Sequence, residues 1–206
     1  MSTIENRDNQ IGNYALAKRL AVGGMGQIFL GRRLKGNDLV AIKVLADSLV
    51  QDARYAQLLI AEAAAVASLR HPNIVQLLDF GEDNGRHYLV LEYIPGQNLR
   101  EALWRMGRKP EIPAMPLRVK CGVFADVARA LSYMHGTGRD GQPFIHRDVS
   151  PSNIMLSDDG QVKLIDLGVA QDGSQQTTPG VLKGKFAYMA PEYVSGGAYD
   201  HRVDLW

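Results

Sequence analysis

Residues 144–168 read FIHRDVSPSNIMLSDDGQVKLIDLG, in which a polar turn that ends in glycine separates two short apolar runs. Two apolar runs around such a turn predict a β-hairpin. Polar clusters flank both runs, and they place Asp148, Asn153 and Asp166 at the ends of the predicted strands. We therefore expect one small rigid hairpin to hold these three side chains.

These three side chains suit metal and proton chemistry. A hard cation such as Mg²⁺ prefers oxygen ligands, typically one or two carboxylates with substrate phosphates and water. Asp166 and Asn153 can supply such oxygens, which leaves Asp148 to orient a hydroxyl group and accept its proton. The alternative is an ordinary polar loop, where Asp, Asn, Ser and Gly are common. That alternative accounts for each residue alone but poorly for the whole set in this order.

The order of these motifs resembles the eukaryotic-type (Hanks-type) protein kinase family, and the bacterial Ser/Thr kinases most closely. The motifs are HRD at 146–148 followed by Asn153, DLG at 166–168 and APE at 190–192. The resemblance extends over residues 14–206. It implies an α+β fold of two lobes, ATP and Mg²⁺ as cofactors, and transfer of the γ-phosphoryl group to Ser or Thr hydroxyls of a protein.

A glycine-rich turn, LAVGGMG at 20–26, joins two strand-like runs at 14–21 and 27–33. Glycines let backbone N–H groups approach phosphate oxygens without an intervening side chain, although a plain hairpin would use the same residues. The turn resembles the glycine-rich loop of the family, with alanine in place of its first glycine. The resemblance implies nucleotide binding by Ala21, Gly23, Gly24 and Gly26.

Lys43 and Glu62 each lie in apolar surroundings, the first in a strand-like run at 39–45 and the second in a helical run at about 52–69. Each side chain alone would be unremarkable on a solvent-facing surface. A buried ammonium group is costly without an anionic partner, so we expect the two to pair. In the family this pair is catalytic, because it holds the lysine against the α- and β-phosphates.

Strand-like runs at 75–80 and 87–92 complete a five-stranded antiparallel sheet, and LEYIPG at 91–96 resembles the hinge between kinase lobes. In the family, backbone groups of the hinge bind adenine. Apolar side chains from both lobes line the purine pocket in the family. Each of these residue types is also common in an ordinary hydrophobic core. The residues implied are Leu91, Glu92 and Ile94 in the hinge, and Ile28, Ala41 and Met155 in the walls.

The composition shift along the chain predicts a flexible tail at 1–12, an N-lobe at 13–93 and a partial C-lobe at 94–206 that begins with helices. Cys121 lies in the helical run at 116–135, and we expect it to be buried as a small hydrophobic residue. A basic, proline-containing loop follows the first C-lobe helix, and the sequence assigns it no role. The last seven residues resemble the start of the helix whose aspartate supports the catalytic loop, so we expect this chain to lack the later helices of the family.

The composition is that of a soluble globular protein, with 206 residues, 46% hydrophobic residues and a formal net charge of +1. A nearly neutral chain argues against a large nucleic-acid surface. Its single cysteine cannot form an internal disulfide, which favours a reducing compartment. Because no apolar run reaches transmembrane length, we expect a cytoplasmic protein without a membrane segment in this chain.

The segment at 169–183, between DLG and APE, is rich in Gly, Ser, Thr and Gln. A disordered loop has this composition, but the position resembles the activation segment of kinases. There a phosphate would pair with Arg147 and order the segment. The candidate phosphorylation sites are Thr177 and Thr178, with Ser174 behind them, and a homodimer would allow one copy to phosphorylate the other.

Two departures from the family lie at positions that touch in its fold. Ser150 stands where Ser/Thr kinases have a lysine that steadies the γ-phosphate, and Lys185 stands where they have a threonine. Our hypothesis is that Lys185 restores the missing charge near the γ-phosphate. The competing interpretation is a degraded site, which would make the chain an ATP-binding pseudokinase or an inactive fragment that acts as a scaffold. A small-molecule phosphotransferase is disfavoured by the APE segment.

Overall fold

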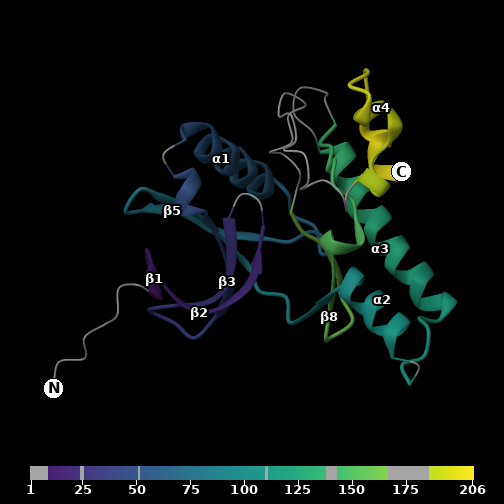
Figure 1. The fold of residues 1–206 in the computed structure, drawn as a ribbon, viewed down its shortest axis with the longest axis horizontal. Helices are drawn as coiled ribbons and strands as arrows, with labels where there is room; N and C mark the ends of the chain where they lie inside the picture. Colours follow the sequence, from purple (N-terminus) through teal and green to yellow (C-terminus); the bar gives the residue numbers. More distant parts are fainter. Residues whose placement is uncertain (1–8, 24–25, 51, 110, 138–142, 167–185) are drawn as a thin grey trace. The chain divides into compact units, whose positions relative to one another are not determined.

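The computed structural model describes residues 9–23, 26–50, 52–109, 111–137, 143–166 and 186–206 (Figure 1). The chain forms two compact units, which we call the first and the second unit. The first unit comprises Met1–Ala67 and Gln76–Tyr93, and the second comprises Ser68–Val75 and Ile94–Trp206. The chain therefore passes from one unit to the other three times. Each unit is described by itself below.

The first unit contains an antiparallel six-stranded sheet with the order β1-β2-β3-β4-β6-β5. Five of the strands match those expected from the sequence, and the sixth, β1, pairs Gln10 and Ile11 with the start of β2. Ile11 is only 3% exposed, so burial of this side chain draws residues of the expected tail into the sheet. The strands are β1 (Gln10–Ile11), β2 (Tyr14–Val22), β3 (Gly26–Arg33), β4 (Leu39–Leu45), β5 (Leu77–Asp83) and β6 (Arg86–Glu92).

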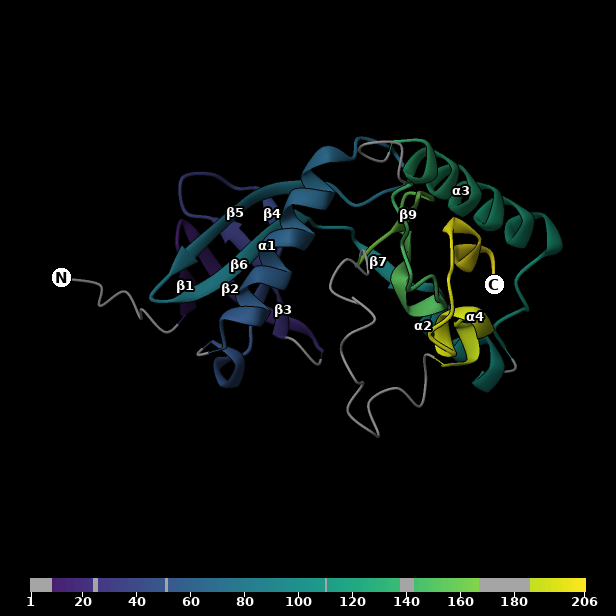
Figure 2. The ribbon, with the colours of Figure 1, turned by 90° about the horizontal axis from the view of Figure 1, so that it is seen from above.

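Helix α1 (Ala53–Ser68) lies along one face of this sheet (Figure 2). Its Leu59 and Ala63 pack against Leu45 of β4 and Leu89 of β6. Because successive side chains of a strand point to opposite faces, the alternate residues of β4 form a separate core on the other face. That core contains Ile11, Tyr14, Val40, Ile42, Val44, Tyr88 and Val90. A short 3-10 helix, η2 (Asp47–Leu49), connects β4 to α1.

The second unit contains helices and a small antiparallel sheet with the order β7-β8-β9. Asn98 caps the first helix, because its Oδ1 accepts a hydrogen bond of 2.8 Å from the main-chain N–H of Glu101. The strands are β7 (Gly96–Asn98), β8 (Ile154–Ser157) and β9 (Val162–Leu164). The α-helices are α2 (Leu99–Arg108), α3 (Leu117–Gly136) and α4 (Pro191–Val194), and the 3-10 helices are η3 (Pro151–Asn153), η5 (Phe186–Tyr188) and η6 (His201–Leu205).

Helix α3 buries one face, which carries Val123, Val127, Ala130, Leu131 and Met134. Cys121 is exposed, so the expectation that it is buried was wrong. The reason is helix geometry: at 3.6 residues per turn, Cys121 lies about 200° around the helix from Val123. It shares the outer face with Leu117 and Phe124, which are 75% and 67% exposed.

A short segment between α1 and β5 belongs to the second unit. Its Val75 donates a main-chain hydrogen bond of 2.9 Å to the carbonyl of Leu164 in β9, and the N–H of Leu164 donates one of 2.8 Å to the carbonyl of Asn73. The side-chain amide of Asn73 also donates to the carbonyl of Val162. Helix α1 ends at Ser68, before His71, at which Pro72 disfavours a helical conformation.

No helix in the described part of the chain is both long enough and apolar enough to cross a membrane.

Candidate active site

The predicted hairpin is formed by β8 and β9, which pair with Ile154 opposite Leu164. Its turn closes at Gly160, which has a φ of 88°. At the other end, the main-chain N–H of Ile165 donates a 3.0 Å hydrogen bond to the carbonyl of Asn153. Asp166 follows directly and adopts a φ of 52°. The hairpin therefore brings the main chain of Asn153 close to the residue that precedes Asp166.

The side chain of Asn153 is fixed on Asp148. Its Nδ2 donates 2.9 Å to the main-chain oxygen of Asp148 and 2.8 Å to the Oδ2 of the same residue. Both amide hydrogens are thereby used, so Oδ1 is the atom of Asn153 that can serve as a ligand. Together with the Asp166 carboxylate, this oxygen fits the ligand preference of Mg²⁺. Asp148 and Asn153 are 8% and 4% exposed, so neither can rotate freely.

A buried carboxylate from η6 supports the loop that precedes Asp148. The two oxygens of Asp204 accept main-chain hydrogen bonds of 2.8 Å from His146 and 2.7 Å from Arg147. Arg147 has a φ of 65°, an uncommon conformation for a residue with a side chain. The guanidinium of Arg147 lies 5.7 Å from the ring centre of Tyr199. The support that the sequence motif predicted for residues 200–206 is thus provided by Asp204.

Sequence reasoning missed a further contact with this carboxylate. The Nε2 of His135, near the end of α3, lies 2.8 Å from Oδ2 of Asp204. The ring of His201 lies 4.9 Å from that of His135, measured between ring centres. A histidine near a helix C-terminus is ordinary, because a positive charge is favourable there. No signal in the sequence singled out His135.

His146 is fully buried and shapes the turn before Asp148. Its Nδ1 accepts a 3.2 Å hydrogen bond from the main-chain N–H of Asp148. Burial lowers the pKa of the imidazole, and the neighbouring carboxylates of Asp204 and Asp148 only partly oppose this shift. A ring that accepts at Nδ1 while neutral carries its hydrogen on Nε2. His146 therefore acts as a neutral structural residue.

In the first unit, Lys43 of β4 pairs with Glu62 of α1, as expected. The Lys43 Nζ lies 2.7 Å from Oε1 and 2.9 Å from Oε2 of Glu62. The side chains are 16% and 4% exposed, respectively. Such a bidentate contact fixes the ammonium group at one position on the sheet. The catalytic role of the pair remains a prediction.

The predicted nucleotide-binding residues of the first unit lie on neighbouring strands. Ile28 pairs with both Ala21 and Lys43 across β2, β3 and β4, and Ala41 pairs with Leu91 of β6.

Close main-chain contacts hold the glycine-rich turn at 20–26 and the hinge residue Glu92 in place. The N–H of Gly23 donates 2.8 Å to the carbonyl of Gly26. A Cβ atom on Gly26 would come within 2.1 Å of the Val44 oxygen, so the chain requires glycine there. The N–H of Glu92 donates 3.0 Å to the carbonyl of Gln76 and is therefore already engaged.

The remaining predicted residues fall in the second unit or outside the described residues. Ile94 follows directly after the first unit, and Met155 lies in β8 opposite Asn98 and Lys163. Ser150 is 3% exposed, and its Oγ lies 2.9 Å from that of Ser152. The predicted residues outside the described ranges are Gly24, Leu167, Gly168, Ser174, Thr177, Thr178 and Lys185.

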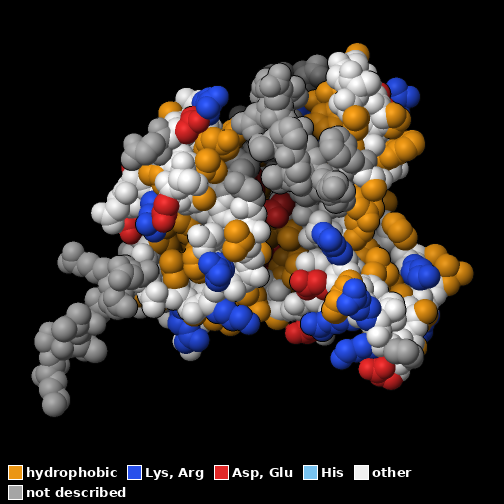
Figure 3. All heavy atoms as spheres, viewed as in Figure 1, with side chains coloured by type: hydrophobic (Ala, Val, Ile, Leu, Met, Phe, Trp, Pro, Cys, Tyr) orange, Lys and Arg blue, Asp and Glu red, His pale blue; other side chains and the backbone are white. Residues whose placement is uncertain are grey.

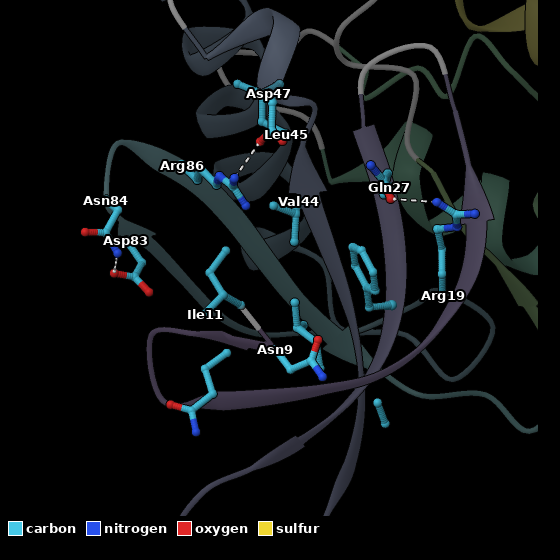
Figure 4. A pocket seen from close by; sticks show the side chains of 14 residues that line it. Asn9, Ile11, Arg19, Gln27, Val44, Leu45, Asp47, Asp83, Asn84 and Arg86 are labelled. Carbon is cyan, nitrogen blue, oxygen red and sulfur yellow. Dashed lines mark hydrogen bonds and ion pairs between the residues drawn. The ribbon is translucent and has the colours of Figure 1, made fainter. Parts of the chain in front are cut away.

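A hollow of about 590 Å³ opens on the sheet of the first unit (Figure 4). Ile11 and Val44 line it, and Arg86 and Asp47 form a 3.0 Å ion pair at its edge. Lys43 directly precedes Val44 in β4 and so points to the opposite face. None of the described residues predicted to bind nucleotide lines the hollow, and it is therefore not the predicted site.

Comparison with known proteins identifies the family. The profile of the protein kinase domain matches residues 14–206. Tyrosine-protein kinase MasK of Myxococcus xanthus is 39% identical over 203 residues, which cover 95% of this chain and 31% of that protein. Serine/threonine-protein kinase PknA of Mycobacterium tuberculosis is 36% identical over 198 residues, which cover 90% of this chain and 42% of that protein.

A solved structure agrees with these sequence matches. The kinase domain of PknI from Mycobacterium tuberculosis superposes with a TM-score of 0.68 at 27% identity, covering 93% of this chain and 67% of that one. The chain therefore belongs to the protein kinase family and has its α+β fold. It spans 31% of the length of MasK and 42% of the length of PknA.

Proposed function

We propose that this chain is the catalytic part of an ATP-dependent protein kinase, which transfers the γ-phosphoryl group of ATP to a hydroxyl group of a protein. The observation that carries the proposal is the double hydrogen bond from Asn153 to Asp148. It fixes a candidate base beside a candidate metal ligand in a buried loop. The alternative, a pseudokinase that binds ATP without transfer, shares the fold but does not need this arrangement.

Each fixed side chain has one task in the proposed reaction. Asp148 orients the acceptor hydroxyl and takes its proton as the oxygen attacks. Asn153 and Asp166 would hold Mg²⁺, which would neutralise charge on the phosphates of bound ATP. Glu62 holds the Lys43 ammonium in place for the α- and β-phosphates. Transfer is then mainly a matter of positioning and charge stabilisation.

The adenine and phosphate sites are proposed from the sequence together with the strand pairing of the first unit. The glycine-rich turn serves the phosphates, and hinge residues serve adenine through their main chain. Because the N–H of Glu92 is engaged by Gln76, we assign adenine binding at Glu92 to its carbonyl group. Ile28, Ala41 and Met155 provide apolar contacts in this proposal.

The γ-phosphate lacks its usual lysine on the catalytic loop, where Ser150 instead lies against Ser152. We propose that Lys185 supplies the positive charge. Lys185→Ala should then lower turnover far more than ATP affinity, because charge near the γ-phosphate matters most in the transition state. An equal loss in both quantities, or no loss, would contradict this assignment.

The acceptor is proposed to be Ser or Thr, with tyrosine as a second candidate. Support for Ser/Thr comes from PknA, whose name describes a serine/threonine kinase. Support for tyrosine comes from MasK, which is named a tyrosine-protein kinase and is 39% identical. Phosphoamino-acid analysis of the product separates the two.

The regulation and the cellular location of the protein are proposed from its sequence. Phosphorylation at Thr177, Thr178 or Ser174, by a second copy in a homodimer, would order the activation segment through Arg147. We propose a cytoplasmic location. Fully active protein without phosphate on these residues, shown by mass spectrometry, would contradict the regulatory part.

The test is a transfer assay with radiolabelled ATP, Mg²⁺ and a generic basic protein as acceptor. We expect labelling that is abolished by Asp148→Asn and by Asp166→Ala. Asp158→Asn is the matched control, because Asp158 is exposed in the turn of the same hairpin and its variant should label normally. ATP-induced thermal stabilisation without any labelling would refute the kinase proposal and favour the pseudokinase.

A further inference from the structure

One face of α2 presents a tryptophan between two arginines. Arg100, Trp104 and Arg108 are spaced by four residues, so they follow one another along the same face of the helix. We call them the α2 stripe. Trp104 is 57% exposed, and the Arg108 guanidinium lies 4.8 Å from the centre of its indole ring. This distance is that of a cation–π contact, which holds the arginine beside the ring.

The α2 stripe lies within a basic part of the second unit, which the proposed function does not use. Residues 100–120 contain six basic and two acidic side chains and so carry a net charge of +4, against +1 for the whole chain. Figure 3 shows Lys and Arg side chains over α2 at the lower right of the view. The exposed basic residues are Arg100, Arg105, Arg108, Lys109, Arg118 and Lys120.

The described residues offer no ion pair that neutralises the stripe. No salt bridge between residues in the described ranges involves Arg100 or Arg108. A solvated basic helix face is common, but a large exposed indole between two guanidinium groups is not what solubility requires. Tryptophan and arginine are the residue types that carry most of the binding energy in protein interfaces.

We propose that the α2 stripe binds a short acidic peptide segment of a partner protein. Guanidinium groups bind carboxylates through two parallel hydrogen bonds, and the indole offers an apolar contact between them. The stripe spans eight helical intervals, roughly 12 Å at 1.5 Å per residue, which suits a few residues of extended peptide. Charge complementarity therefore selects an anionic peptide.

One observation favours a peptide over a membrane or a nucleic acid. Glu101 and Glu111 lie among the basic residues. A broad anionic surface or a continuous phosphate backbone would meet these acids as well, whereas a short peptide can place its carboxylates beside the arginines alone. The inference concerns binding without ATP, so it does not depend on phosphoryl transfer.

The test measures binding of a fluorescein-labelled peptide, EEDLEEDFEE, by fluorescence anisotropy at low and physiological salt. We expect saturable binding that weakens as salt rises. Trp104→Ala should weaken it roughly thirtyfold, as expected when an interface hot spot is truncated. The double variant Arg100→Glu with Arg108→Glu should abolish it.

The control reverses two charges elsewhere. Lys18→Glu with Lys35→Glu changes the net charge equally, at exposed positions of the first unit, and should bind the peptide like the original chain. Equal weakening in both double variants would show nonspecific charge attraction and overturn the proposal. Tighter binding to phosphatidylserine vesicles or to single-stranded DNA than to the peptide would also overturn it. Circular dichroism confirms that each variant is folded.

Discussion

Replacing Asp204 should damage the catalytic loop more than any change at the surface of η6. The Asp204 side chain has no exposed area, and it accepts the main-chain N–H groups of His146 and Arg147. Asp204→Ala leaves both N–H groups without this acceptor, one of them buried and the other partly buried. A hydrogen bond to a charged group contributes about 1.5–3 kcal/mol, so losing two should cost about 3–6 kcal/mol.

That cost is large beside the roughly 5–15 kcal/mol by which whole domains are stable. Asp204→Asn keeps one acceptor oxygen but loses the charge, and it should cost about half as much. We expect both variants to lose kinase activity, because the Asp204 carboxylate accepts the N–H of Arg147, which adopts a left-handed conformation next to Asp148.

Amide hydrogen exchange measures this effect locally, at His146 and Arg147. Exchange at these two amides should accelerate strongly in Asp204→Ala, since local opening reports the lost stability. Asp200→Ala is the matched control: Asp200 lies at the start of the same 3-10 helix, but it contacts exposed Arg202 instead. The reasoning is refuted if both amides exchange as slowly in Asp204→Ala as in the original chain.

Three further predictions concern other parts of the chain. Glu62→Gln should lower the free energy of unfolding of the first unit by about 2–3 kcal/mol, measured by urea unfolding. This cost is smaller than that of breaking a fully buried ion pair, because the Lys43 side chain is 16% exposed. Gly96→Ala should cost more than about 1 kcal/mol, since Gly96 has a φ of 146° and a Cβ there would lie 2.1 Å from the Leu156 oxygen; an unchanged melting temperature would contradict this. Burial lowers the pKa of His146 below its unfolded value of about 6.5, so the unfolded chain takes up the proton first and stability should fall as the pH drops below about 6.5. In His146→Gln, the free energy of unfolding should depend less on pH below about 6.5. An unchanged pH dependence would show that other groups cause the loss of stability.

The parts of the site that could be predicted from the sequence depend either on neighbouring residues or on the high cost of burying an unpaired charge. The hairpin around Gly160 follows from two apolar runs and a turn. The pairing of Lys43 with Glu62 follows because each charge lies in an apolar run and needs a partner. Both arguments use only neighbouring residues or a strong desolvation cost.

What could not be predicted depends on packing between distant segments. The contact of His135 with Asp204 joins residues 69 positions apart, and it exists only because η6 lies against the end of α3. Strand β1 contains two residues, too few for any periodicity, and burial of Ile11 decides its place. Cys121 was misjudged because a helical run of apolar residues does not show which face is covered.

The route of the chain between the two units limits how the protein can be divided. Because it passes between them after Ala67, Val75 and Tyr93, no single proteolytic cut yields fragments that each contain one unit alone. A truncation that ends at Tyr93 would retain residues 68–75 but remove Leu164, to which Asn73 and Val75 are hydrogen-bonded. Exchange of the first unit between relatives would therefore require two joined pieces of sequence, with the segment at 68–75 left to the recipient.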